Sequence, residues 1–170
     1  MANFKISLRK CLRWEGGYTE ILDDGYECTN SGITIATYQK VYGDEKDCSD
    51  LKKMTAQQRD YIYKTLYWDK IKGDELNCQP IADLLYNWAV GSGVKSAVKH
   101  IQRLVGVADD GIMGNITLSA VNDYKDPHRL FDMLWEDRYQ FFQNLCRRNP
   151  QRTKFLRGWI NRLKSHTWYE

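Results

Sequence analysis

Near the N-terminus, three side chains have the types and the spacing that glycosidic bond cleavage requires. Glu15 lies at the end of an apolar helical stripe, where poor hydration disfavours the charged form of a carboxyl group. A protonated glutamic acid can act as a general acid on the departing oxygen. Asp24 follows in a polar segment that should keep it ionised, and the Thr29 hydroxyl could hold a water molecule beside it. Two carboxyl groups in such different environments are typical of a glycosidase, although acids near helix ends and in turns are also common as plain surface charges.

An amphipathic helix is expected to position the first of these acids. Phe4, Leu8, Cys11, Leu12 and Glu15 fall on one helical face, and the glycine pair that follows should end the helix. The acid therefore continues the apolar stripe instead of opposing it.

The segment from Gly17 to Ile33 has no sustained period and is expected to be a loop or a short twisted hairpin. Asp24-Gly25 is a turn signal, and Asp23 is an alternative to Asp24 as the second acid.

The remainder of the chain is predicted to be almost entirely helical. Thr55 and Gln58 form a capping-box pattern before one helix, and Asn115 can cap another. The expected helices begin near Ile35, Thr55, Pro80, Val94, Asn115, Pro127 and Phe155.

Length and charge restrict the functional classes. A chain of 170 residues fits one folding unit, and its net charge of +3 comes from 25 basic and 22 acidic residues. This weak charge does not favour nucleic-acid binding, which usually requires a concentrated basic face, but it would suit a polyanionic cell-wall polymer.

The N-terminus has no apolar core typical of a secretory signal, and no segment is apolar and long enough to span a membrane. We therefore expect synthesis in the cytoplasm. The five cysteines are scattered and odd in number, which predicts reduced, mostly buried thiols.

Metal and cofactor chemistry is not expected. His100, His128 and His166 are isolated from other ligand types, so we predict surface or interfacial positions for them and no metal site. Phosphate-binding glycine loops are also absent from the sequence. The two carboxyl groups would supply the proton transfers without a cofactor.

The stretch "EGGYTEILDDGYECTNSGIT" resembles the opening motif of glycoside hydrolase family 108, which comprises phage and bacterial N-acetylmuramidases. The match includes Glu15 to Tyr18, Asp24, and the block from Thr29 to Thr34. This resemblance implies a lysozyme-like helical fold and cleavage of the β-1,4 bond between N-acetylmuramic acid and N-acetylglucosamine. It also implies that Glu15 is the general acid, while Asp24 with Thr29 positions or activates water or stabilises the transition state.

Substrate-binding residues are expected around this motif. Tyr18 lies close to Glu15 in the sequence, and Asn30 belongs to the matched block. The later stretch "LLYNWAVGSG" is similar to a second family motif, in which Asn87 replaces an acid and Gly91 replaces an asparagine. The Gly25-Tyr26-Glu27 turn also departs from the family pattern, which has Pro-Gly-Gly there. Tyr18, Asn30 and Asn87 are our predicted substrate contacts.

The stretch "IQRLVGVADDGIMGNITLSAV" resembles the predicted peptidoglycan-binding module that follows the catalytic part in this family. The resemblance implies a catalytic part over residues 1–92 and a helical, peptidoglycan-binding part over 93–170, packed together. Asp110 and Thr117 are the candidate sugar contacts. Asp110-Gly111 also favours a turn whether or not a ligand binds there, so a purely structural role is the alternative.

The sequence thus predicts a monomeric, all-α, lysozyme-like peptidoglycan hydrolase whose partner is the glycan strand, without stable membrane insertion. A catalytically inactive peptidoglycan-binding or secretion-assisting protein on the same fold is the alternative. By similarity to phage endolysins, we expect holin-type release to the cell wall or periplasm.

Overall fold

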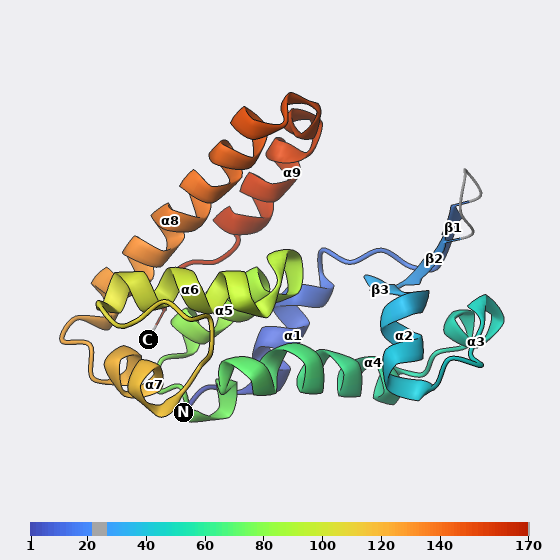
Figure 1. The fold of residues 1–170 in the computed structure, drawn as a ribbon, viewed down its shortest axis with the longest axis horizontal. Helices are drawn as coiled ribbons and strands as arrows, with labels where there is room; N and C mark the ends of the chain where they lie inside the picture. The colour runs from blue at the N-terminus through green and yellow to red at the C-terminus, as the bar shows by residue number, and fades with distance from the viewer. Residues whose placement is uncertain (22–26, 170) are drawn as a thin grey trace.

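The computed structural model describes residues 1–21 and 27–169 and shows a mainly helical chain with a small β-sheet at one end (Figure 1). This arrangement confirms the predicted fold class. The elements are α1 (Phe4–Leu12), β1 (Thr19–Ile21), β2 (Glu27–Asn30), β3 (Ile33–Thr34), α2 (Ile35–Tyr42), α3 (Cys48–Lys52), α4 (Ala56–Tyr63), the π-helix η1 (Lys64–Trp68), the 3-10 helices η2 (Asp69–Ile71) and η3 (Gly73–Glu75), α5 (Gln79–Ser92), α6 (Val94–Val105), α7 (Asn115–Asn122), α8 (Pro127–Arg148), the 3-10 helix η4 (Pro150–Arg152) and α9 (Thr153–Lys164).

Helix α5 is the centre of the hydrophobic core. All its residues from 80 to 89 are buried, and it contacts α1, α6 and α8. A helix that is buried on every side must lie inside the protein, because it has no polar face to present to water. Trp88 and Leu85 are fully buried within it. Helices α2 and α3 lie beside the sheet, away from α5, and α8 and α9 form an antiparallel pair that projects from the rest (Figure 1).

The polar segment after α1 forms a three-stranded antiparallel sheet in the order β1-β2-β3, consistent with the hairpin alternative. The turn between β2 and β3 consists of Ser31 and Gly32, which both have positive φ, 50° and 76°. Two positive φ angles in a two-residue loop are typical of a type I′ hairpin turn. The Asn-Ser-Gly stretch therefore produces a sharp reversal that places Gly32 at the tip.

Helix boundaries largely follow the predicted capping signals. Thr55 and Gln58 form the expected capping box at the start of α4, and Asp126 caps α8 before Pro127. The prediction for Asn115 was wrong, because Gly114 occupies the N-cap and Asn115 is the first helical residue. Its side-chain oxygen instead accepts a hydrogen bond from Lys72 across the fold, at 2.6 Å.

The prediction of reduced thiols was wrong for two of the five cysteines. Cys28 on β2 and Cys48 at the start of α3 form a disulfide. A separation of 20 residues gave no local signal for this pairing, since the two cysteines meet only after the sheet has folded onto α3. Cys11, Cys78 and Cys146 are free.

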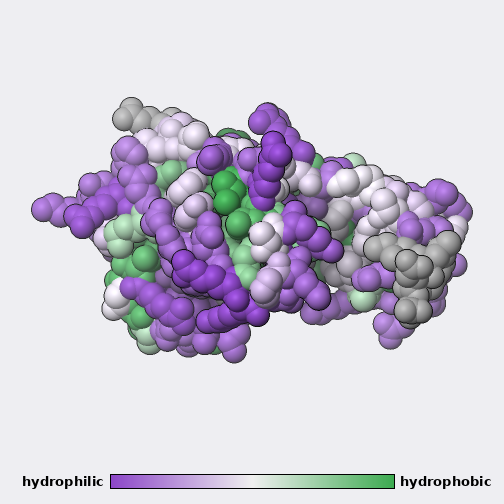
Figure 2. Space-filling view, turned by 90° about the horizontal axis from the view of Figure 1, so that it is seen from above, coloured by the Kyte–Doolittle hydropathy of each residue, from purple (hydrophilic) through white to green (hydrophobic). Residues whose placement is uncertain are grey.

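The described part of the chain contains no helix that is both long and apolar enough to cross a membrane. Figure 2 shows a face that is mostly hydrophilic, with hydrophobic residues in a narrow band near its middle and in a second patch toward its left end.

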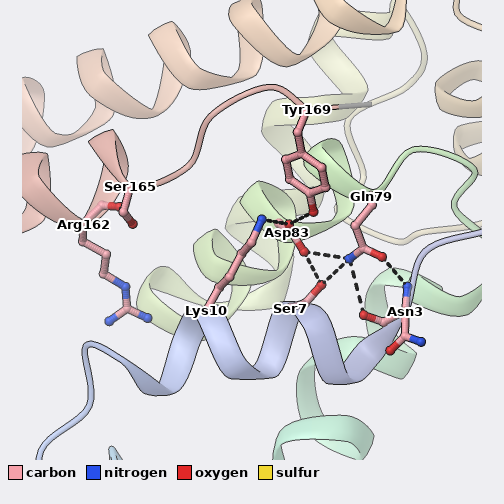
Figure 3. Close-up of polar contacts among 8 residues, drawn as sticks. All are labelled: Asn3, Ser7, Lys10, Gln79, Asp83, Arg162, Ser165 and Tyr169. Carbon is pink, nitrogen blue, oxygen red and sulfur yellow. Dashed lines mark hydrogen bonds and ion pairs between the residues drawn. The ribbon is translucent and has the colours of Figure 1, made fainter.

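A buried carboxylate joins the two ends of the chain to the central helix. Asp83 on α5 is 2% exposed and accepts hydrogen bonds from Ser7 and Lys10 of α1, from Gln79, and from Tyr169 of the C-terminal tail, all at 2.6–2.7 Å. Figure 3 shows these donors converging on Asp83 from different segments. Hydrogen bonds of this number compensate for the cost of burying the charge.

We predict that Asp83→Asn lowers the free energy of unfolding by about 3 kcal/mol, because Lys10 loses its anionic partner and one amide cannot accept all four hydrogen bonds. Chemical denaturation would measure the change. Asp60→Asn is the control, because Asp60 forms an ion pair with Arg59 nearer the surface and should cost much less. Equal decreases in the free energy of unfolding of the two variants would contradict a central role for Asp83.

Candidate functional site

Glu15 lies just beyond the end of α1, held by a turn whose backbone N–H donates to the Leu12 carbonyl at 3.2 Å. Helix α1 ends at Leu12, earlier than the apolar stripe suggested, and the turn continues the chain in the same direction. The Glu15 side chain is 16% exposed, so it is largely removed from water.

The tip of the hairpin approaches the Glu15 carboxylate from one side. A methyl group added at Gly32 would clash with Oε2 of Glu15 and would lie 2.8 Å from the hydroxyl oxygen of Tyr63. Tyr63 donates a hydrogen bond to the Ser31 carbonyl at 2.8 Å, which fixes the turn. Burial raises the pKa of Tyr63, so it stays a neutral hydrogen-bond donor. The glycine is required here by both its positive φ and the close approach of the acid.

Arg162 of α9 occupies the other side of the carboxylate. Its Nη1 lies 2.8 Å from Oε1 of Glu15, its Nε donates to Oδ1 of Asn87 at 3.2 Å, and its Nη2 contacts Sγ of Cys11 at 3.2 Å. Burial is the main reason that the pKa of Cys11 is raised to about 12, so the sulfur is a neutral thiol. Glu15 is thus the negatively charged partner among these three contacts.

A pocket of about 470 Å³ opens beside this ion pair. It lies where the end of α5 meets the α8-α9 pair, and its wall combines charged and aromatic side chains. Among the lining residues are Glu15, Asn87, Arg138, Phe142, Trp159 and Arg162.

The structure brings only some of the predicted site residues to this pocket. Glu15 and Asn87 line it, and the buried Nδ2 of Asn87 has no hydrogen-bond partner in the described part of the chain. Thr29 lies on β2, where its hydroxyl and that of Thr19 share a hydrogen bond of 2.8 Å. Asp24 falls outside the described residues, as do Asp23 and Tyr26.

Tyr18 and Asn30 make contacts within the sheet region. The Tyr18 hydroxyl donates to Glu20, and the ammonium group of Lys52 lies 5.3 Å from its ring centre. Asn30 donates to the Leu51 carbonyl at 2.9 Å and thereby ties β2 to α3. This hydrogen bond to the Leu51 carbonyl gives Asn30 a structural role within the motif.

Asp110 and Thr117 are joined by a single buried side chain. Gln102 is 1% exposed and donates to Oδ1 of Asp110 at 2.8 Å and to Oγ1 of Thr117 at 3.0 Å, while its own oxygen accepts from the Gly111 N–H. The hydrogen bonds that Asp110 accepts from Gln102 and from the Ile112 N–H hold its pKa below the usual range. The observed geometry accounts for this motif as a means of closing the loop between α6 and α7.

The histidines differ from expectation in one case. His100 is half-buried against Trp88 and Phe141, and His128 is exposed and stacks on Trp168. His166 is 4% exposed, so its predicted surface or interfacial position was wrong. Burial lowers its pKa to about 4, which keeps it neutral at neutral pH.

Sequence reasoning missed the arginines of the pocket. Arg162 is separated from Glu15 by 147 positions, and Arg138 lies in the middle of α8. No local pattern links them to the acid. The only available signal was the spacing of Trp159 and Arg162, which puts both on one face of α9.

The fold and this site define a lysozyme-like, peptidoglycan-related protein. Residues 8–93 match the model of the glycosyl hydrolase 108 family, and residues 96–164 match that of a predicted peptidoglycan domain. The chain belongs to the glycosyl hydrolase 108 family. It is similar to the solved structure of Brucella abortus SagA, with 29% identity and a TM-score of 0.80 over 95% of this chain and 90% of that one. A comparison with curated proteins finds no match.

Replacing Gly32 tests the packing of the hairpin tip on the acid. We expect Gly32→Ala to lower the free energy of unfolding by about 1–3 kcal/mol, because an alanine is strained at this positive φ and its methyl group displaces the Glu15 carboxylate. Thermal or chemical denaturation would measure this. Gly17→Ala is the matched control, since nothing lies within 4 Å of its added methyl group. An unchanged stability in Gly32→Ala would refute the close approach.

Proposed function

We propose that the protein is an N-acetylmuramidase that cleaves the β-1,4 bond between N-acetylmuramic acid and N-acetylglucosamine, with Glu15 as the general acid. The observation that carries this proposal is the position of Glu15, which is largely buried, lines the pocket and contacts the hairpin tip of the family motif. Membership in a glycosyl hydrolase family and the second match to a peptidoglycan domain support the substrate class.

The second catalytic group in this proposal is Asp24, assisted by Thr29. An ionised carboxylate is needed either to activate water or to stabilise an oxocarbenium-like transition state. Thr29 lies on the strand that follows Asp24 in the chain, and the disulfide at the neighbouring Cys28 anchors this strand to α3. Tyr18 and Asn87 are proposed substrate contacts. Asn87 lines the pocket, and its buried Nδ2 has no hydrogen-bond partner among the described residues.

A catalytically inactive peptidoglycan-binding protein is the second candidate, and the Arg162–Glu15 ion pair specifically favours it. A general acid must carry a proton and reach the leaving oxygen, whereas Oε1 of Glu15 is occupied by Arg162. On this alternative, Glu15 stabilises the contact between α9 and α1, and the pocket binds the glycan without cleaving it.

We further propose that the protein acts as a monomer at the cell wall or in the periplasm, after endolysin-type release. The Cys28–Cys48 disulfide supports an oxidising place of action, because disulfides persist mainly outside the reducing cytoplasm.

The decisive measurement is the release of reducing ends from purified peptidoglycan by the wild type and by Glu15→Gln. The glutamine keeps the shape and can still accept from Arg162, but it has no proton to transfer. We expect a loss of at least about 100-fold in rate, the usual contribution of a general acid.

Glu136→Gln serves as the control for this experiment, because Glu136 is an exposed residue of α8 whose side chain accepts from Gln140. It should retain full activity. A wild type that binds walls of several chemotypes without releasing reducing ends would establish the inactive alternative instead.

The two adjacent aspartates provide a matched pair for the second acid. We expect Asp24→Asn to reduce the rate of reducing-end release by at least about 100-fold, while Asp23→Asn retains most of it, because one carboxylate serves the reaction. Steady-state rates on the same peptidoglycan would measure both. The reverse order would assign the role to Asp23, and two active variants would remove the second carboxylate from the mechanism.

A further inference from the structure

Arg138 is a buried cation that lacks an anionic partner. It is 3% exposed, and no carboxylate of the described residues lies within ion-pair distance of it. Its guanidinium lies over the rings of Trp88, Phe141 and Phe142, at 4.2–5.1 Å from their centres, and its Nη1 donates to Ser92 at 2.9 Å. Such ring contacts offset only part of the cost of removing a charge from water.

The Nη2 end of this guanidinium borders the pocket. A methyl group added at Gly91 would lie 3.2 Å from Nη2 of Arg138, and Gly91 itself is exposed. Both residues line the pocket that contains Glu15. Because glycine has no side chain, nothing at position 91 covers Nη2. The asparagine of the family pattern would cover it.

Other donors reach the same pocket from neighbouring elements. The buried Nδ2 of Asn87 on α5 has no partner among the described residues, and Arg162 on α9 lies beside its Oδ1. Arg152 also lines the pocket, so three arginines face the single carboxylate of Glu15 among the described lining residues. The pocket therefore carries an excess of positive charge and of hydrogen-bond donors.

We propose that this pocket binds a carboxylate group carried by the peptidoglycan strand, with Arg138 and Arg162 as its charged ligands and Nδ2 of Asn87 as a further donor. A planar guanidinium binds a carboxylate through two parallel, charge-assisted hydrogen bonds, whereas a neutral sugar offers no negative charge to it. Phe142 and Trp159, stacked 5.2 Å apart, provide the apolar wall beside it. The inference rests on the proposed substrate class and adds the chemical group that is recognised.

Two parts of the wall polymer carry carboxylates: the lactyl group of a muramic acid without its peptide, and the peptide stem. Binding would be measured by calorimetry in the Glu15→Gln background, so that no ligand is cleaved. The probes are chitotetraose, which has no carboxylate, a stem-free muramic-acid-containing tetrasaccharide, and the same tetrasaccharide with its peptide stems. We expect one or both carboxylated probes to bind at least about tenfold more tightly than chitotetraose. The tighter of the two identifies the source of the carboxylate.

Variants connect this preference to the pocket. Arg138→Met should reduce the affinity ratio between the carboxylated probe and chitotetraose at least fivefold. Arg157→Met, which changes an exposed arginine of α9, should leave this ratio unchanged. Gly91→Asn keeps Arg138 but covers Nη2, so it should also weaken the preference if Arg138→Met fails to fold. Equal affinity for chitotetraose and both carboxylated probes, or an unchanged preference in folded Arg138→Met or in Gly91→Asn, would overturn the proposal.

The outcome is separable from the proposed catalytic function. Reducing-end release without a carboxylate preference would leave the muramidase proposal standing and reject this pocket assignment. A carboxylate preference that depends on Arg138, in a protein that releases no reducing ends, would support the pocket assignment in a wall-binding protein.

Discussion

Asp83 lies in the interior and accepts hydrogen bonds from residues near both ends of the chain. These hydrogen bonds hold the C-terminal tail, and with it α9, next to α1. Tyr169 brings the C-terminal tail to Asp83, while Ser7 and Lys10 bring α1 to the same carboxylate. Since the tail directly follows α9, the cluster holds that helix where Arg162 reaches Glu15. A buried carboxylate with several donors tolerates few alternative arrangements, because each lost hydrogen bond leaves part of its charge unpaired.

Two stretches of the chain that match separate family models contribute to one site. Glu15, Gly32 and Asn87 come from the first, and Arg138 and Arg162 come from the second. The second region therefore does more than add a neighbouring helical layer: it supplies most of the positive charge around the acid. His166 adds no further positive charge near Arg138 and Arg162, because its low pKa keeps this buried side chain neutral.

Local patterns in the sequence were sufficient for most helices and for the motif that contains the acid. The capping box joins Thr55 to Gln58, and the Asp126 side chain accepts from the Arg129 N–H, so both caps depend on residues only three positions apart. Two of the wrong predictions involve partners far away in the chain. Cys28 on β2 forms a disulfide with Cys48 at the start of α3, and Asn115 accepts a hydrogen bond from Lys72 instead of capping its helix. Periodicity records which face of a helix is apolar, but it carries no information about which distant charge that helix will meet.

The same limitation explains why Arg162 is the most consequential residue that the sequence did not reveal. In the described arrangement its guanidinium donates to Oε1 of Glu15, and an ion pair of this kind favours the charged carboxylate over the protonated form that a general acid requires. A ligand carboxylate in the proposed pocket would give Arg162 a second anionic partner. The two ion pairs would then compete for one guanidinium, each with a Coulomb energy on the order of 4 kcal/mol for charges about 4 Å apart near a protein surface. If Arg162 exchanged Glu15 for the ligand carboxylate, Glu15 would be released without the unfolding of any element. The Arg162 guanidinium that restrains Glu15 in the free protein would then also be the group that binds the proposed ligand.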